Sequence, residues 1–121
     1  MGNITFETLL GLTIARITGL EVGSDDVVLL TECGRTFRMH HYRDCCEDVH
    51  LADITGDVAD LIGSPILRAE EATSDASADV SDSSGTWTFY KLATRKGYVD
   101  IRWLGESNGY YSEAVDFEEV K

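Results

Sequence analysis

The stretch TWTFYKLATRKGYVDIRWL, residues 86–104, decides the fold of this chain. Two runs rich in aromatic and β-branched residues, at 86–94 and 98–104, have the composition of strands. They flank the turn Arg95-Lys96-Gly97, which ends in a glycine suited to a positive φ. The stretch therefore predicts an antiparallel hairpin.

The second run of this hairpin alternates between apolar and polar side chains. Its apolar residues share one face of the pleat and are Val99, Ile101 and Trp103. If Leu92 pairs with Val99, then Lys91 lies opposite Asp100 and Phe89 opposite Arg102 on the other face. A glycine bulge at the turn would instead shift this register by one residue and mix the faces. We therefore expect one face to meet the core and the other to carry aromatic and cationic groups.

Similar signals on both sides of the hairpin predict the rest of a sheet. A further strand at Tyr110–Phe117 follows the turn 107–109 and is expected to complete a three-stranded unit with the hairpin. Short helices are predicted at Thr5–Leu10 and Val58–Ile62. The remaining strands are predicted at Thr13–Val22, Val27–Thr31 and Thr36–Tyr42, which turn signals join into a β-meander, and at Val49–Ile54 and Ile66–Thr73. The predicted fold class is α+β, with about seven to eight mostly antiparallel strands and one or two short helices.

We expect a single domain over residues 1–121, because the length is that of one ordinary domain and no internal repeat is visible. Residues 74–85 contain many serines and aspartates and hardly any large apolar residues. They are predicted to form a flexible acidic loop, because they offer little apolar surface to offset the entropy of ordering.

The charge of the chain restricts its partners. The 22 acidic and 10 basic residues give a net charge of −12, which disfavours direct binding to nucleic acid and favours basic partners. No phosphate-binding or dinucleotide-binding fingerprint is present, so no cofactor is expected.

The cysteines and the apolar runs indicate a cytoplasmic protein. The three cysteines are Cys33, Cys45 and Cys46, an odd number, and adjacent cysteines bridge only with a strained backbone. We therefore expect reduced thiols. No apolar run is long enough to cross a membrane, and no export signal is visible.

Residues 40–60 gather histidines, cysteines and carboxylates in twenty-one positions. A metal site here would use His41, Cys45, Cys46 and His50, although adjacent cysteines on an extended chain point to opposite faces. The simpler alternative is that a thiol is buried while carboxylates cap loop amides. The acidic residues of the segment are a candidate acidic face: Asp44, Glu47, Asp53, Asp57 and Asp60.

Aromatic and basic residues around the hairpin form a second candidate site. A base stacked on a ring, with its phosphate held by Arg102, is the chemistry that this composition suits. The alternative is that the rings belong to the core and the cations are solvated. The candidate ligand-binding residues are Trp87, Phe89, Lys91, Tyr98, Arg102, Asn108 and Tyr110.

Several motifs resemble those of a family of small proteins found mainly in bacteriophages. They are His41-x-x-Asp-Cys-Cys-Glu47, Asp53-Ile-x-Gly-Asp57, Leu61-Ile-Gly-x-Pro-Ile66, Thr86-Trp-x-Phe-Tyr90, Gly97-Tyr-Val-x-Ile-Arg-Trp103 and Ser107-Asn-Gly-Tyr-Tyr-Ser-Glu113. The family has no agreed biochemical function. The resemblance implies a phage accessory protein, and many such proteins inhibit host immunity.

The combined expectation is a non-enzymatic inhibitor of a bacterial defence system, in the cytoplasm of the infected host. It would bind either a small nucleotide signal or the nucleic-acid groove of a defence protein, which its acidic face would imitate. A homo-oligomer is compatible with both mechanisms. The alternatives are a metal-dependent hydrolase or nuclease built on residues 40–57 and a component of the virion or of its assembly.

Overall fold

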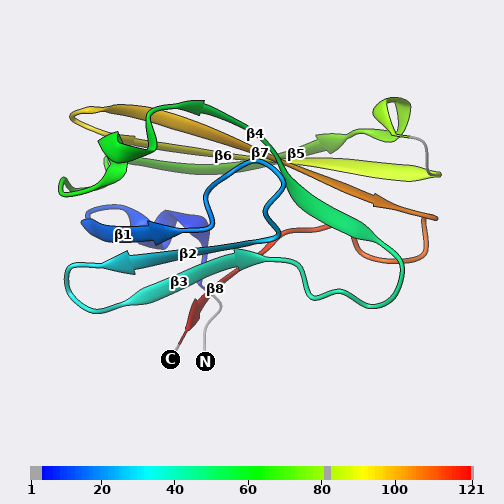
Figure 1. Ribbon diagram of the computed structural model, residues 1–121, viewed down its shortest axis with the longest axis horizontal. Helices are drawn as coiled ribbons and strands as arrows, with labels where there is room; N and C mark the ends of the chain where they lie inside the picture. Colours follow the sequence, from blue (N-terminus) through cyan, green and yellow to red (C-terminus); the bar gives the residue numbers. More distant parts are fainter. Residues whose placement is uncertain (1–3, 81–82, 121) are drawn as a thin grey trace.

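The computed structural model describes residues 4–80 and 83–120, and these form two four-stranded antiparallel sheets that lie face to face (Figure 1). The first sheet has the strand order β1-β2-β3-β8, and the second has the order β4-β7-β6-β5. The strands are β1 (Ile14–Thr18), β2 (Asp26–Thr31), β3 (Thr36–His40), β4 (Asp48–Gly56), β5 (Arg68–Asp75), β6 (Ser84–Thr94), β7 (Gly97–Ser107) and β8 (Asp116–Val120). Buried side chains from both sheets and from the segment before β1 form one core.

The predicted α+β class is wrong, because the fold is nearly all-β. The helical segments of the described residues are three short 3-10 helices: η1 (Phe6–Leu9), η2 (Val58–Leu61) and η3 (Ser77–Asp79). The two predicted helices fall on η1 and η2. Each is followed closely by a glycine with positive φ, Gly11 or Gly63, which ends the helical segment. A segment this short forms too few hydrogen bonds to offset the entropy lost on nucleating an α-helix.

The predicted hairpin of β6 and β7 is confirmed, and of the two registers considered it has the one without a glycine bulge. Leu92 pairs with Val99, and Phe89 pairs with Arg102. The apolar side chains of β7 are almost fully buried, as expected for the face that meets the first sheet. This hairpin forms the centre of the second sheet, because β4 and β5 pair on either side of it.

The predicted third strand of the C-terminal unit is wrong. The chain leaves β7, and β8 begins only at Asp116 and pairs with β3 in the other sheet. Phe117 explains this choice, because its ring stacks on Phe37 at a centroid distance of 5.5 Å and meets Phe6 at 5.2 Å. The aromatic contacts lie in the core between the sheets, and no strand-pairing signal in the sequence reveals them.

The acidic segment 74–85 contains the end of β5, η3 and the beginning of β6, and its residues 81–82 lie outside the described part of the chain. Ala76 is fully buried, and its N–H donates to the carbonyl of Gly85 at 2.9 Å. The ladder between β5 and β6 therefore reaches further into this segment than predicted, and its flexibility stays a prediction.

The edge strand β4 is partly covered by the connection between β1 and β2. The N–H of Gly23 donates to the carbonyl of Leu51, and the N–H of Leu51 donates to the carbonyl of Ser24, at 2.8 and 2.7 Å. These bonds tie the two sheets together beside the 41–47 loop. Among the described residues, no helix has the length and apolar character needed to cross a membrane.

Candidate functional site

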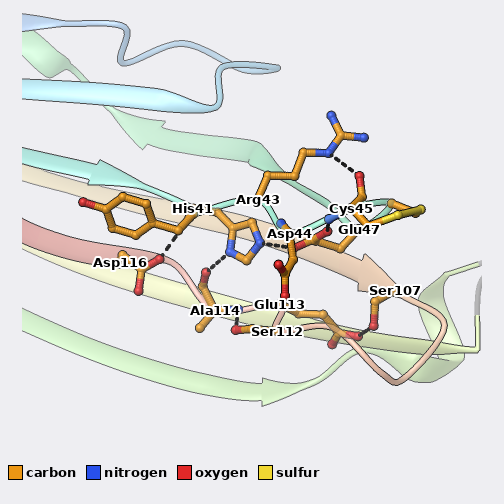
Figure 2. A network of polar contacts seen from close by, with 12 residues as sticks. His41, Arg43, Asp44, Cys45, Glu47, Ser107, Ser112, Glu113, Ala114 and Asp116 are labelled. Carbon is orange, nitrogen blue, oxygen red and sulfur yellow. Dashed lines mark hydrogen bonds and ion pairs between the residues drawn. A yellow bond between two sulfur atoms is a disulfide. The ribbon is translucent and has the colours of Figure 1, made fainter.

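The loop between β3 and β4 is closed by a buried pair, His41 and Glu47 (Figure 2). The two side chains lie 2.8 Å apart and are 6% and 0% exposed. The Glu47 carboxylate also accepts the backbone N–H groups of Asp44 and Cys45, at 2.8 and 2.9 Å. The motif His41-x-x-Asp-Cys-Cys-Glu47 therefore folds its own loop around one carboxylate.

The Glu47 carboxylate is charged at neutral pH. Burial raises its pKa, but the hydrogen bonds from His41 and from the amides of Cys45, Asp44 and Glu47 itself lower the pKa to about 2. The other ring nitrogen of His41 faces the carbonyl of Ala114 at 2.7 Å. Since both partners of the ring are acceptors, both hydrogen bonds form at once only when both nitrogens carry protons.

A second buried carboxylate, Glu113, closes the loop between β7 and β8. It accepts hydrogen bonds from the hydroxyls of Ser107 and Thr86. Burial raises the pKa of Glu113, but the hydroxyls of Ser107, Thr86 and Ser84 lower it overall. Glu113 is not among the candidate residues predicted from the sequence. The feature that could have indicated it is its distance along the chain from Ser107, which equals that between His41 and Glu47.

The two loops are joined into one unit, because the His41 ring of the first contacts the Ala114 carbonyl of the second (Figure 2). The carboxylates of Glu47 and Glu113 accept hydrogen bonds from within the protein, and they thereby hold the backbone of the two loops. We call this unit the clasped loops, residues 41–47 and 107–115. Tyr110, 83% exposed, stands on it.

The proposed metal ligands are not assembled into a site. Cys45 and Cys46 are joined in a disulfide, so the expectation of reduced thiols is wrong for this pair, while Cys33 is a free, exposed thiol. Both ring nitrogens of His41 are occupied by Ala114 and Glu47. Over residues 4–80 and 83–120, no three His, Cys, Asp or Glu side chains are grouped so that they could hold an ion.

A cavity of about 150 Å³ lies beside the clasped loops. The β1–β2 connection, the 41–47 loop and the start of β4 surround it. Its lining mixes both signs of charge and consists of Gly23, Asp25, His41, Arg43, Glu47, Asp48, Val49 and His50. The mixture gives no clear preference for an anion or a cation.

The residues predicted to bind a ligand divide between two places. Trp87, Phe89, Lys91, Tyr98 and Arg102 lie together on the outer face of the second sheet, where the Arg102 guanidinium lies 4.5 Å from the centroid of the Trp87 ring. Asn108 and Tyr110 belong to the clasped loops, beyond the other end of β7. Ten residues of extended strand separate Tyr98 from Asn108 by roughly 30 Å, so the seven do not form a single site.

Carboxylates lie beside the cations of this surface, and of these only Asp100 was expected there from the sequence. Asp53 lies 3.9 Å from Arg102, Asp100 pairs across the strands with Lys91, and Glu70 pairs with Lys91 from β5. Strand alternation within β5 and β7 is the signal for Glu70 and Asp100. The cations of this face are thus matched by acidic groups.

The residues of the predicted acidic face do not all lie on one exposed surface. Glu47 is buried and therefore does not belong to an exposed acidic face, and Asp60 is half-buried with its carbonyl bonded to the Thr94 hydroxyl. The other predicted members follow the edge strand β4, together with Asp48, which sequence analysis left out. We call this row the β4 acidic edge; its exposed residues are Asp44, Asp48, Asp53 and Asp57.

A family model described as Domain of unknown function (DUF7448) matches residues 7–117, which include the clasped loops, the β4 acidic edge and the β6–β7 hairpin. No curated protein and no solved structure matches the chain.

Proposed function

The chain belongs to this domain family of unknown function. We propose that it is a non-enzymatic protein that binds and covers a cationic surface of a partner protein. The resemblance to phage proteins supplies the setting. In that setting the partner is a bacterial defence protein with a groove for nucleic acid, and the chain occupies the groove as an acidic mimic.

The pairing of the arginines is the observation that carries this proposal. Four of them form ion pairs, at 2.8 to 3.9 Å: Arg35 with Glu119, Arg38 with Asp26, Arg68 with Glu70, and Arg102 with Asp53. An anionic ligand would have to compete with these carboxylates. The surplus charge of −12 therefore consists of acidic groups, and a basic partner is the complement of such a surface.

The β4 acidic edge is the best candidate for the contact. Its four residues are exposed and lie along or beside one edge strand of the second sheet; Asp53 also contacts Arg102, at 3.9 Å, so the surplus charge of the edge is carried by Asp44, Asp48 and Asp57. A row of fixed carboxylates resembles a phosphate backbone in charge, and the Lys and Arg of a nucleic-acid groove bind such a row.

Infection assays in bacteria that carry single, defined defence systems test the proposal. We expect the chain to restore phage growth against one system and, when purified, to displace labelled nucleic acid from that system's effector. Asp48→Lys combined with Asp57→Lys should weaken the displacement by at least about tenfold. Glu7→Lys combined with Glu32→Lys is the matched control, because it changes the net charge equally at exposed positions away from β4.

Equal losses in the two double variants would reject the β4 acidic edge as the contact. Restored phage growth without any displacement of nucleic acid would reject the mimic mechanism altogether.

Sequestration of a nucleotide signal is the second candidate, favoured by the stacking of Arg102 on Trp87. Isothermal titration with cyclic and linear nucleotides distinguishes it. Heat of binding that is lost in a folded Arg102→Ala variant would support sequestration. No heat with any nucleotide, together with capture of a purified effector, supports the mimic mechanism.

A further inference from the structure

The outer face of the second sheet is complementary to itself. The β6–β7 hairpin presents four cross-strand pairs on this side: Trp87 with Leu104, Phe89 with Arg102, Lys91 with Asp100, and Ala93 with Tyr98. We call these eight residues the hairpin face. We propose that two copies of the chain associate through the hairpin face. The two-fold axis between them is parallel to the strands and lies just outside this face, midway between β6 and β7.

The complementarity follows from the symmetry. Rotation by 180° about this axis places β6 of one copy over β7 of the other, at the same level along the strands. Residues that are cross-strand neighbours within one copy therefore face each other between copies. Lys91 then faces Asp100 of the second copy, and Asp100 faces its Lys91, so one contact forms two ion pairs.

The other three levels of the face are equally matched. The Arg102 guanidinium faces the Phe89 ring, an arrangement that attracts a cation to an aromatic face. Trp87 faces Leu104, and Tyr98, which is 57% exposed, faces Ala93. Association would remove these rings and aliphatic groups from water. Two sheets stack face to face in this way within ordinary β-sandwiches.

The charge distribution selects this face over the rest of the surface. Two copies with a net charge of −12 each repel one another, and the repulsion is weakest where basic residues are concentrated. On this side of the sheet Lys91 and Arg102 offset Asp100 and the flanking Glu70 and Asp53, so the face carries far less surplus negative charge than the chain as a whole. The aromatic groups thus lie where a second copy is least repelled.

Sedimentation equilibrium of the full chain, from about 1 µM to about 1 mM, tests the dimer. We expect a monomer–dimer equilibrium in which Lys91→Asp and Asp100→Lys each raise the dissociation constant at least about tenfold, because like charges then face each other twice. An equimolar mixture of the two variants should dimerise like the wild type, because each mixed pair brings two carboxylates against two ammonium groups.

Matched controls are Arg16→Asp and Glu7→Lys, which change the charge equally at exposed positions outside the hairpin face and should leave the equilibrium unchanged. Thermal melts establish that each variant is folded; if one is not, Tyr98→Asp replaces it and should also weaken the dimer at least about tenfold.

The proposal is overturned if the wild type stays monomeric over the whole range, or if both charge variants dimerise like the wild type. It is also overturned if both variants are monomeric and their mixture does not associate. In the proposed dimer, position 91 of one copy faces position 100 of the other, so the two charge variants must restore association when they are mixed. The measurement needs no partner protein, so its outcome is independent of the proposed inhibitor function.

Discussion

Glu47 and Glu113 show how single carboxylates organise long loops in this protein. Each is withdrawn from water and held by hydrogen bonds from its own loop or from a neighbouring strand. A buried charge is tolerated only when its hydrogen-bonding capacity is met, so each carboxylate fixes the backbone around it. The exposed Tyr110 is thereby presented on an ordered support.

The pH dependence of stability should report the charge of Glu47. Its folded-state pKa of about 2 lies below the ordinary value of 4.5. Its contribution is therefore complete above the ordinary value and is lost as the pH falls from there toward about 2. Glu47→Gln should lower the urea midpoint at neutral pH and flatten its decline in acid, as measured by circular dichroism.

Glu7→Gln, at an exposed position, is the control and should follow the wild-type pH profile. Parallel acid profiles for Glu47→Gln and the wild type would contradict the account of the 41–47 loop.

Gly105 should tolerate no side chain. A Cβ at this position would lie 2.7 Å from the Cβ of Glu113 and would also collide with the Glu113 carbonyl oxygen. Gly105→Ala must therefore displace the 107–115 loop, at a cost of roughly 1–3 kcal/mol in the free energy of unfolding. Equilibrium urea unfolding measures the loss. A variant as stable as the wild type would mean that this loop is not packed against β7.

Among the strands, pairing was predictable where partners are adjacent in sequence. The meander of β1, β2 and β3 and the hairpin of β6 and β7 were both expected, and both are present. The pairing of β8 with β3 was not expected, because β3 lies far from β8 along the chain. Local turn chemistry selects a neighbouring strand, whereas a distant partner is selected by packing in the core.

The acidic segment should tolerate shortening. Ala76 and Gly85 already face each other across the β5–β6 ladder, so Asn-Gly in place of residues 77–83 closes the hairpin with a three-residue turn and keeps Ser84, whose hydroxyl binds Glu113. Loop-closure entropy changes slowly with length, and we expect the free energy of unfolding to change by less than about 1 kcal/mol. Urea titration followed by Trp fluorescence measures this change. A larger loss would show that residues 77–83 support the fold.

For the protein as a whole, the net charge of −12 is a destabilising term in the folded state. The four arginine ion pairs are partly exposed and contribute little individually, so their screening by salt costs little. The general repulsion among surplus carboxylates is larger, and salt screens it as well.

Moderate salt should therefore stabilise the protein. Raising the ionic strength from about 0.01 M to about 0.15 M shortens the Debye length from roughly 30 Å to roughly 8 Å, and the melting temperature should rise. Differential scanning calorimetry in NaCl and, as a control for ion-specific effects, in KF provides the measurement. A melting temperature that falls in both salts would mean that the ion pairs outweigh the repulsion.

The sequence by itself determined the approximate positions of most strands of this protein and the two faces of β7. Alternation along β7 placed Val99, Ile101 and Trp103 inside and Arg102 outside, because side-chain direction in a strand follows directly from the order of residues. It also brought Trp87, Phe89 and Arg102 together on one face, since a tight turn fixes the register of its two strands.

Only the tertiary structure decided which charges are buried, which are paired and which are free. Glu47 and Asp44 are three residues apart and equally acidic in sequence, yet one lies in the interior and the other is exposed. Their difference depends on His41 and on amides that converge only after β3 and β4 are placed. Burial and convergence are properties of packing between distant segments, and a linear pattern of residues does not contain them.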